Sequence, residues 1–170
     1  MLRLVGALLL AGGGLALGLG AAEERERRRA ALDSWRAALA LLAAELAFRL
    51  PPMEELLNMG ARRASEPART ALLTAAGELE HLGEKSFEAI WGQALQTCAP
   101  PLVPEDIELL SRLGAVLGRY DGESQRQAVE RAGAELETRA AQVREELRRG
   151  GKTWAAVGLS LGLFTAILLL

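Results

Sequence analysis

The sequence predicts an all-helical protein, with one antiparallel bundle of about six helices between two transmembrane helices. The chain has 170 residues, and two stretches without charge lie at its ends, residues 4–22 and 153–170. Residues 23–152 hold all 22 acidic residues and 19 of the 20 basic ones, a net charge of −3. Only ten of these 130 residues are β-branched, whereas Ala, Leu, Glu and Arg abound, which favours helices over strands.

The two charge-free stretches have the length of membrane spans. As helices, they would reach about 28 Å and about 27 Å, close to the roughly 30 Å hydrocarbon core of a bilayer. We therefore expect an N-terminal transmembrane helix over residues 1–22, a helical domain over 23–152 and a C-terminal transmembrane helix over 153–170. The first stretch also fits a cleaved signal peptide, since Arg3 precedes an apolar run and Gly20-Ala21-Ala22 offers small residues for cleavage.

Basic residues flank both stretches on the side of the middle segment. Before the first stretch stands only Arg3, and after it follow Arg25, Arg27, Arg28 and Arg29. Before the second stretch stand Arg144, Arg148, Arg149 and Lys152, and no charged residue follows it. Because positively charged flanks remain in the cytoplasm, the middle segment is predicted to face the cytoplasm from the cell membrane.

Both stretches carry glycines four residues apart, Gly14 with Gly18 and Gly158 with Gly162. Such spacing leaves a groove on one helix face that lets another membrane helix approach closely. The two spans are therefore candidates to pack on each other or on other membrane proteins. Glycine is also common in membrane helices, so a chance match is the competing interpretation.

Within the middle segment, the first helix is expected from Glu23 to about Leu50, where Pro51-Pro52 stops it. The last is expected from about Glu123 to Arg149. Apolar residues recur every three or four positions in both, which predicts that they pack as an antiparallel stalk. These residues are Leu32, Trp35, Leu39, Leu42 and Leu46 in the first helix, and Val129, Ala132, Leu136, Ala140, Val143 and Leu147 in the last.

Four shorter helices are expected between these two. One runs from Met53 to about Ala64, and another continues to His81 with Ser65 as its N-cap and Pro67 in its first turn. Gly83 ends the second helix. The third begins at Ser86, has Phe87, Ile90, Trp91 and Leu95 on one side, and ends before Pro100-Pro101. The fourth starts near Pro104 and buries Ile107, Leu110, Leu113 and Leu117 until Gly118.

The charged residues of this segment are predicted to have structural roles. Glu105 and Asp106 open a helix, where the helix dipole favours negative charge. Glu23 and Glu24 lie four residues before Arg27 and Arg28, as on a solvated helix face. Anionic lipid headgroups are the alternative partners of these arginines.

The residue inventory argues against an enzyme. With one histidine, His81, and one cysteine, Cys98, the chain offers neither a Cys/His metal cluster nor the elements of a catalytic triad. No glycine-rich phosphate loop of the G-x-x-x-x-G-K type occurs. We therefore expect no cofactor, no metal, no small-molecule substrate and, since the charges of both signs are interspersed, no nucleic acid.

One stretch, residues 117–125, has the sequence Leu-Gly-Arg-Tyr-Asp-Gly-Glu-Ser-Gln and precedes the long final helix. With it, the chain resembles the stage III sporulation protein AB family of endospore-forming bacteria. The likeness covers the whole chain. Its other landmarks are the opening Met-Leu-Arg-Leu-Val-Gly, Glu45-Leu46 before a proline turn and Met53, Trp91, and the closing Lys152-Thr153-Trp154.

This resemblance implies a non-catalytic membrane scaffold in the sporulation channel complex that links mother cell and forespore. It implies a soluble part similar to the cytoplasmic domain of type II secretion F-type platform proteins. The implied partners are the cytoplasmic ATPase and the ring-forming components of that complex. The alternative is an exported, tail-anchored helical binding module whose first segment is cleaved.

Within this motif, the residue types predict local roles. Gly118 is expected to end one helix in a left-handed turn, Asp121 to cap the next helix and Gln125 to hydrogen-bond in the loop. The same loop is a possible docking surface for the ATPase, in which case the charge of Asp121 matters. The candidate residues are Leu117, Gly118, Asp121, Ser124 and Gln125.

Overall fold

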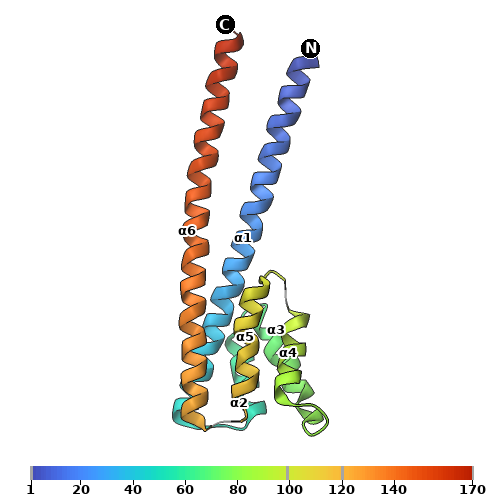
Figure 1. Ribbon diagram of the computed structural model, residues 1–170, viewed down its shortest axis with the longest axis vertical. Helices are drawn as coiled ribbons and strands as arrows, with labels where there is room; N and C mark the ends of the chain where they lie inside the picture. Colours follow the sequence, from blue (N-terminus) through green and yellow to red (C-terminus); the bar gives the residue numbers. More distant parts are fainter. Residues whose placement is uncertain (1, 99, 120, 170) are drawn as a thin grey trace. The chain divides into compact units, whose positions relative to one another are not determined.

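The computed structural model assigns the backbone of every residue except 1, 99, 120 and 170, and it describes the side chains of residues 22–150 apart from 99 and 120. Within these residues the structure is helical, and the β-type pairing is a single bridge between Leu82 and Lys85. The predicted all-α class is therefore confirmed. The helices, shown in Figure 1, are α1 (Leu2–Phe48), α2 (Met53–Arg63), α3 (Ala68–Gly77), the 3-10 helix η1 (Glu78–His81), α4 (Phe87–Thr97), α5 (Pro104–Val116) and α6 (Gly122–Leu169).

The chain divides into two compact units. One comprises residues 1–27 and 142–170, and the other, called the bundle below, comprises residues 28–141. The predicted spans, and with them Gly14, Gly18, Gly158 and Gly162, lie outside the described residues except at Gly20 and Ala22. Within the part of the chain whose side chains the structure describes, no helix is long and apolar enough to cross a membrane.

The first and last helices of the bundle pack as the apolar spacing predicts. Within the bundle, all five predicted residues of α1 are buried, and so are the predicted residues of α6 from Val129 to Ala140. In the other unit, Val143 is buried and Leu147 is half-buried. In the bundle, Arg36 on α1 and Glu137 on α6 form an ion pair of 2.9 Å. A Cβ added to Gly133 would lie 4.0 Å from the Cβ of Leu39. These two contacts run in opposite directions along the helices, so the pairing is antiparallel.

The four shorter helices lie near their predicted places. The third of them starts where predicted: α4 begins at Phe87, and Oγ of Ser86 accepts the backbone N–H of Ala89 at 3.2 Å. Gly83 and Gly118 have φ of +117° and +82°, the left-handed region that glycine adopts without strain. Close packing of α2 on α1 requires Gly60, since a Cβ there would lie 2.8 Å from Cδ2 of Leu42.

The prediction for Ser65 is wrong. The α-helix begins at Ala68, and the carboxylate of Glu66 supplies the acceptor that the serine was expected to supply. Oε2 of Glu66 accepts the backbone N–H of Thr70 at 3.3 Å and its hydroxyl at 2.7 Å. The carbonyl of Ser65 is instead bound by the hydroxyl of Ser34, at 2.6 Å. The helix also tightens into η1 after Gly77 before it reaches His81.

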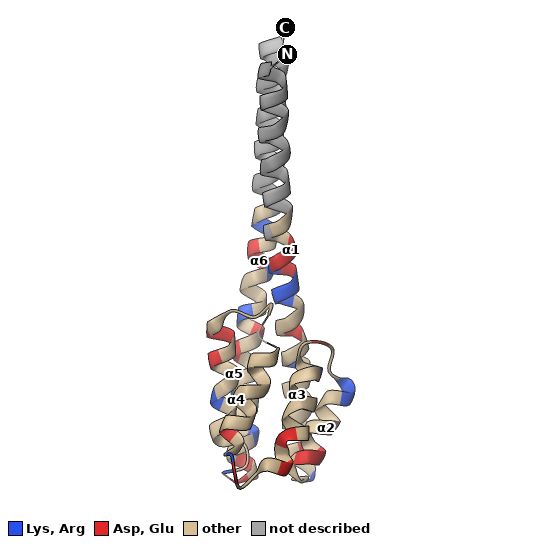
Figure 2. Cartoon of the chain, turned by 90° about the vertical axis from the view of Figure 1, so that its right-hand side faces the viewer, with Lys and Arg blue, Asp and Glu red and all other residues tan. Residues whose placement is uncertain are grey.

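Two tryptophans join α1, α4 and α5 in the core of the bundle. Trp35 and Trp91 are fully buried, and their rings meet edge to face, with centroids 5.8 Å apart and an interplanar angle of 78°. The indole N–H of Trp91 donates to the carbonyl of Leu110 at 2.7 Å. Gly114 gives this indole its space, because a Cβ there would lie 2.9 Å from Cδ1 of Trp91. Basic and acidic residues both occur along the described part of the helices (Figure 2).

Candidate functional site

A buried carboxylate with two arginines joins three helices of the bundle. Asp106, in the first turn of α5, is fully buried. Nε of Arg28 on α1 donates to its Oδ2 at 2.8 Å, and Nη2 donates to Oδ1 at 3.2 Å. Nη1 of Arg139 on α6 donates to Oδ1 at 2.9 Å. We call these three residues the ion clamp.

The clamp keeps Asp106 ionised. Burial by itself raises the pKa of this carboxyl, but the hydrogen bonds from Arg28 and Arg139 outweigh burial and hold the pKa below its ordinary value of 3.8. The backbone N–H of Val103 also points to Oδ2, at 3.4 Å. Every described contact to the carboxylate is therefore with a hydrogen-bond donor, as a buried charge requires.

Sequence reasoning missed this clamp. Asp106 was expected to open a helix together with Glu105, and it does, but the two residues differ in burial: Glu105 is exposed and Asp106 is fully buried. Arg28 was expected to face Glu24 and instead binds Asp106, whereas the expected pair of Arg27 with Glu23 forms at 2.6 Å. A signal was present: Asp106 precedes Leu110, Leu113 and Leu117 by four, seven and eleven residues, so it lies on their apolar face. The predicted burial of Ile107 is wrong, since that residue is half-buried.

The loop between α5 and α6 has the predicted capping contacts. Oδ1 of Asp121 accepts the backbone N–H groups of Glu123 at 3.1 Å and Ser124 at 3.0 Å, and Oδ2 accepts the hydroxyl of Ser124 at 2.8 Å. The bonds from Ser124 lower the pKa of Asp121. The backbone N–H of Gln125 donates to the carbonyl of Asp121 at 3.0 Å, and Leu117 is fully buried. A docking role for this loop stays a prediction.

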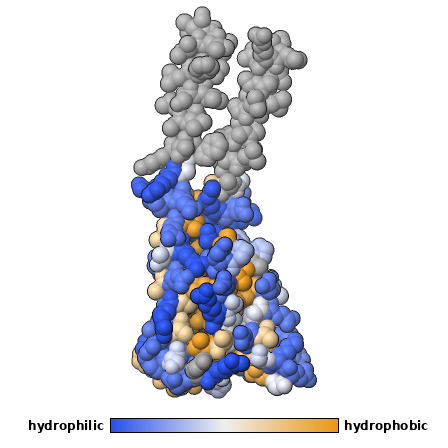
Figure 3. All heavy atoms as spheres, in the orientation of Figure 1, coloured by the Kyte–Doolittle hydropathy of each residue, from blue (hydrophilic) through white to orange (hydrophobic). Residues whose placement is uncertain are grey.

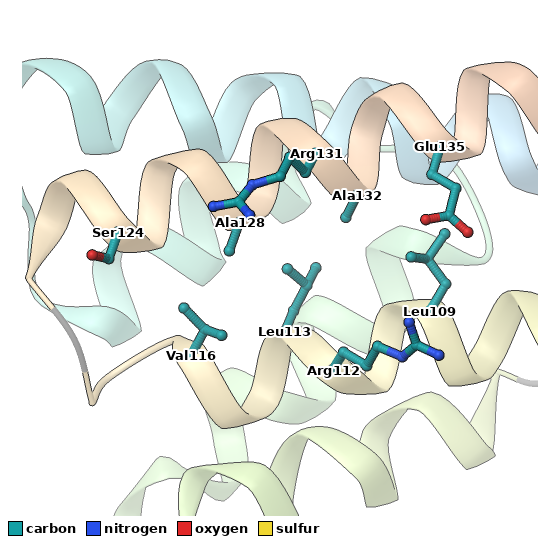
Figure 4. A pocket seen from close by; sticks show the side chains of 9 residues that line it. All are labelled: Leu109, Arg112, Leu113, Val116, Ser124, Ala128, Arg131, Ala132 and Glu135. Atoms are coloured by element: carbon teal, nitrogen blue, oxygen red, sulfur yellow. The ribbon is translucent and has the colours of Figure 1, made fainter.

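A groove of about 470 Å³ lies between α5 and α6 (Figure 4). Three of its lining residues, Leu109, Leu113 and Ala132, are buried, and Val116, Ser124 and Ala128 are half-buried. The exposed lining residues are Arg112, Arg131 and Glu135. In the space-filling view, apolar surface shows between hydrophilic side chains where these two helices adjoin (Figure 3).

Cys98 and His81 are the single cysteine and the single histidine of the sequence, residue types that often act in catalysis or metal binding. Cys98 is buried, with its sulfur 3.4 Å from the hydroxyl of Thr97. His81 is partly exposed at the end of η1, 3.8 Å from the carboxylate of Glu80. No group of three or more potential metal ligands occurs among the side chains that the structure describes.

Three comparisons with known proteins lead to the same family. The family model described as stage III sporulation protein AB matches residues 3–170. Stage III sporulation protein AB of Bacillus subtilis (strain 168) is 26% identical over 172 residues, with all of both chains covered. A solved structure of a stage III sporulation protein AB superposes with a TM-score of 0.62 and 25% identity, covering 72% of this chain and 97% of that one. The chain therefore belongs to the stage III sporulation protein AB family.

Proposed function

We propose that the chain is a non-catalytic, integral-membrane scaffold of the sporulation channel complex between mother cell and forespore. The observation that carries this proposal is the family match over residues 3–170, because it includes both apolar ends as well as the bundle. A scaffold needs a rigid body and surfaces for partners, whereas an enzyme needs reactive groups held in a site. The bundle fits the scaffold role better, since Asp106, the one fully buried charged residue among its described side chains, is held by two arginines.

The membrane part of the proposal depends on the ends of the chain. Residues 4–22 and 153–170 carry no charge, and each has the length of a span. Their basic flanks lie on the side of the bundle, which favours a cytoplasmic bundle anchored in the mother-cell membrane around the forespore. The proposed domain division is 1–22, 23–152 and 153–170.

The ion clamp suits such a scaffold. Arg28 and Arg139 belong to the two helices that lead towards the apolar ends, and Asp106 holds both of them. Within the bundle, Asp106 therefore ties α1 and α6 to α5. Its partners in this proposal are the cytoplasmic ATPase and the ring-forming components of the complex.

Two measurements test the proposal. Reporter fusions after Arg149 should be active in the cytoplasmic form, and activity of a periplasmic-type reporter alone would overturn the topology. Affinity isolation of the full chain from sporulating cells in mild detergent should recover the ATPase and the ring-forming components. Recovery of neither, from cells in which both are made, would overturn the scaffold role.

The mass of the isolated chain separates this proposal from an exported module. A scaffold with two spans keeps residues 1–22, whereas a signal peptide would be cleaved after Ala22. An intact N-terminus is the expected result. Loss of the first 22 residues would instead favour the exported, tail-anchored binding module.

A further inference from the structure

The groove between α5 and α6 has the shape of a binding site for a helix. Leu109, Leu113 and Val116 lie at spacings of four and three along α5, and on α6 the lining residues run from Ser124 to Glu135. At 1.5 Å of rise per residue, the groove therefore extends about 10 Å along α5 and about 16 Å along α6, or two to three turns of a helix.

The floor of the groove selects the kind of contact. Its apolar side chains offer no hydrogen bonds, and the backbone groups of α5 and α6 are used within those helices. An extended strand, which binds through its backbone, has no partner groups here. An amphipathic helix needs none, because it binds through apolar side chains at every third or fourth position. Small residues on one wall, Ala128 and Ala132, let such a helix come close.

The rim of the groove selects the charge of that helix. Arg112 on α5 and Arg131 on α6 come from opposite walls (Figure 4). The carboxylate of the lining residue Glu135 is bound by Arg139 at 2.6 Å, and Arg112 is itself bound to Glu108 at 2.9 Å.

Arg131 is placed differently from these arginines. Its Nε donates to the backbone carbonyl of Gln127 at 3.2 Å, and within the described residues no carboxylate lies in ion-pair range of it. The rim therefore presents an arginine that can bind a carboxylate without displacing another, although residues 23–152 as a whole carry a net charge of −3.

We propose that this groove binds an acidic amphipathic helix of a partner protein, with its apolar side chains on Leu109, Leu113 and Val116 and a carboxylate on Arg131. Complementary charge at the rim sets the partner and its register, and the apolar floor supplies contact area. This inference goes beyond the scaffold role and holds whichever side of a membrane the bundle faces.

Photo-crosslinking of the full chain in the cells that make it tests the proposal. The photoreactive residue p-benzoylphenylalanine replaces Ser124, at one end of the groove, and, as a control, Gln93, an exposed residue of α4. The crosslinked peptide is identified by mass spectrometry. The expected product from position 124, and not from position 93, is a segment with helical apolar periodicity and carboxylates beside it.

Charge exchange then tests the role of Arg131. Arg131→Glu should lower the crosslink yield by about fivefold or more, and Arg131→Gln by less, because a rim ion pair is lost or reversed. Reversal of the partner's carboxylate to arginine should restore the yield with Arg131→Glu. The matched control Arg62→Glu, an exposed arginine of α2, should leave the yield unchanged.

Several results would overturn the proposal. A crosslink to lipid, to a second copy of this chain, or to a basic or non-helical segment would overturn the proposal, as would no crosslink at position 124. An unchanged yield with Arg131→Glu, in a variant whose melting temperature matches that of the parent, would overturn the assignment of charge. Failure of the scaffold role leaves these outcomes unaltered, since they depend only on what occupies the groove.

Discussion

Arg28 and Asp106 are 78 residues apart in the sequence and meet through two hydrogen bonds of 2.8 and 3.2 Å. The carboxylate is fully buried, and about a quarter of the arginine side chain is exposed. Arg139 completes the clamp from the opposite helix at 2.9 Å. One acidic residue therefore joins the first and last helices of the bundle to α5.

Asp106→Asn should destabilise the protein by about 2–4 kcal/mol, because the two arginines lose a buried counter-charge while the shape of the side chain is kept. Thermal or chemical unfolding of the full chain in detergent, followed by circular dichroism, measures it. The matched control is Glu105→Gln, an exposed neighbour that should change stability by less than about 0.5 kcal/mol. Equal effects of both substitutions would contradict the role of the clamp.

The clamp should also make stability depend on pH in a defined direction. The pKa of Asp106 is lowered in the folded protein, so its contribution is present above the ordinary value of 3.8 and is lost as the pH falls through the folded pKa. The difference in melting temperature between the parent and Asp106→Asn should therefore be constant between about pH 5 and 7 and shrink below about pH 4. A difference that grows on acidification would contradict this account.

Gly114→Ala should destabilise the bundle by about 1–3 kcal/mol, the usual effect of overpacking a core. Its Cβ would lie 2.9 Å from Cδ1 of Trp91 and 3.1 Å from the Cα of Glu88, and a backbone atom cannot move aside as a flexible side chain can. Gly92→Ala on α4 is the matched control. Nothing lies within 4 Å of that Cβ, so alanine should be neutral or stabilise the helix by up to about 1 kcal/mol. Denaturant unfolding measures the stability of both variants. Equal stabilities of Gly114→Ala and Gly92→Ala would contradict the overpacking account.

Asp121→Ala should destabilise by about 1 kcal/mol, whereas Asp121→Asn should be nearly neutral, because an amide oxygen can still accept the N–H groups of Glu123 and Ser124. Melting temperatures test this pair. Unchanged melting of Asp121→Asn with loss of complex assembly would make the loop a contact surface that needs the charge.

The positions of the helices were predictable because their signals are local. The apolar spacing of Leu32 and Trp35 in α1, and of Val129 and Leu136 in α6, specifies which face is buried wherever the partner lies. Gly118 and Asp121 likewise mark a turn and a cap through their own backbone and side-chain preferences. The wrong prediction for Ser65 shows where local signals fail. Two adjacent polar residues, Ser65 and Glu66, both offered an acceptor, and Glu66 is the one that accepts the backbone N–H of Thr70.

The sequence by itself determined the all-helical class, the order of the helices and the apolar faces of α1 and α6. Only the tertiary structure decided that Arg28 and Arg139 bind Asp106, and that α5 and α6 leave a groove with Arg131 at its rim. The reason is physical. Helix formation and capping depend on neighbours within about four residues, whereas a buried ion pair and a groove depend on which helices pack together, here across 78 and 33 residues of chain.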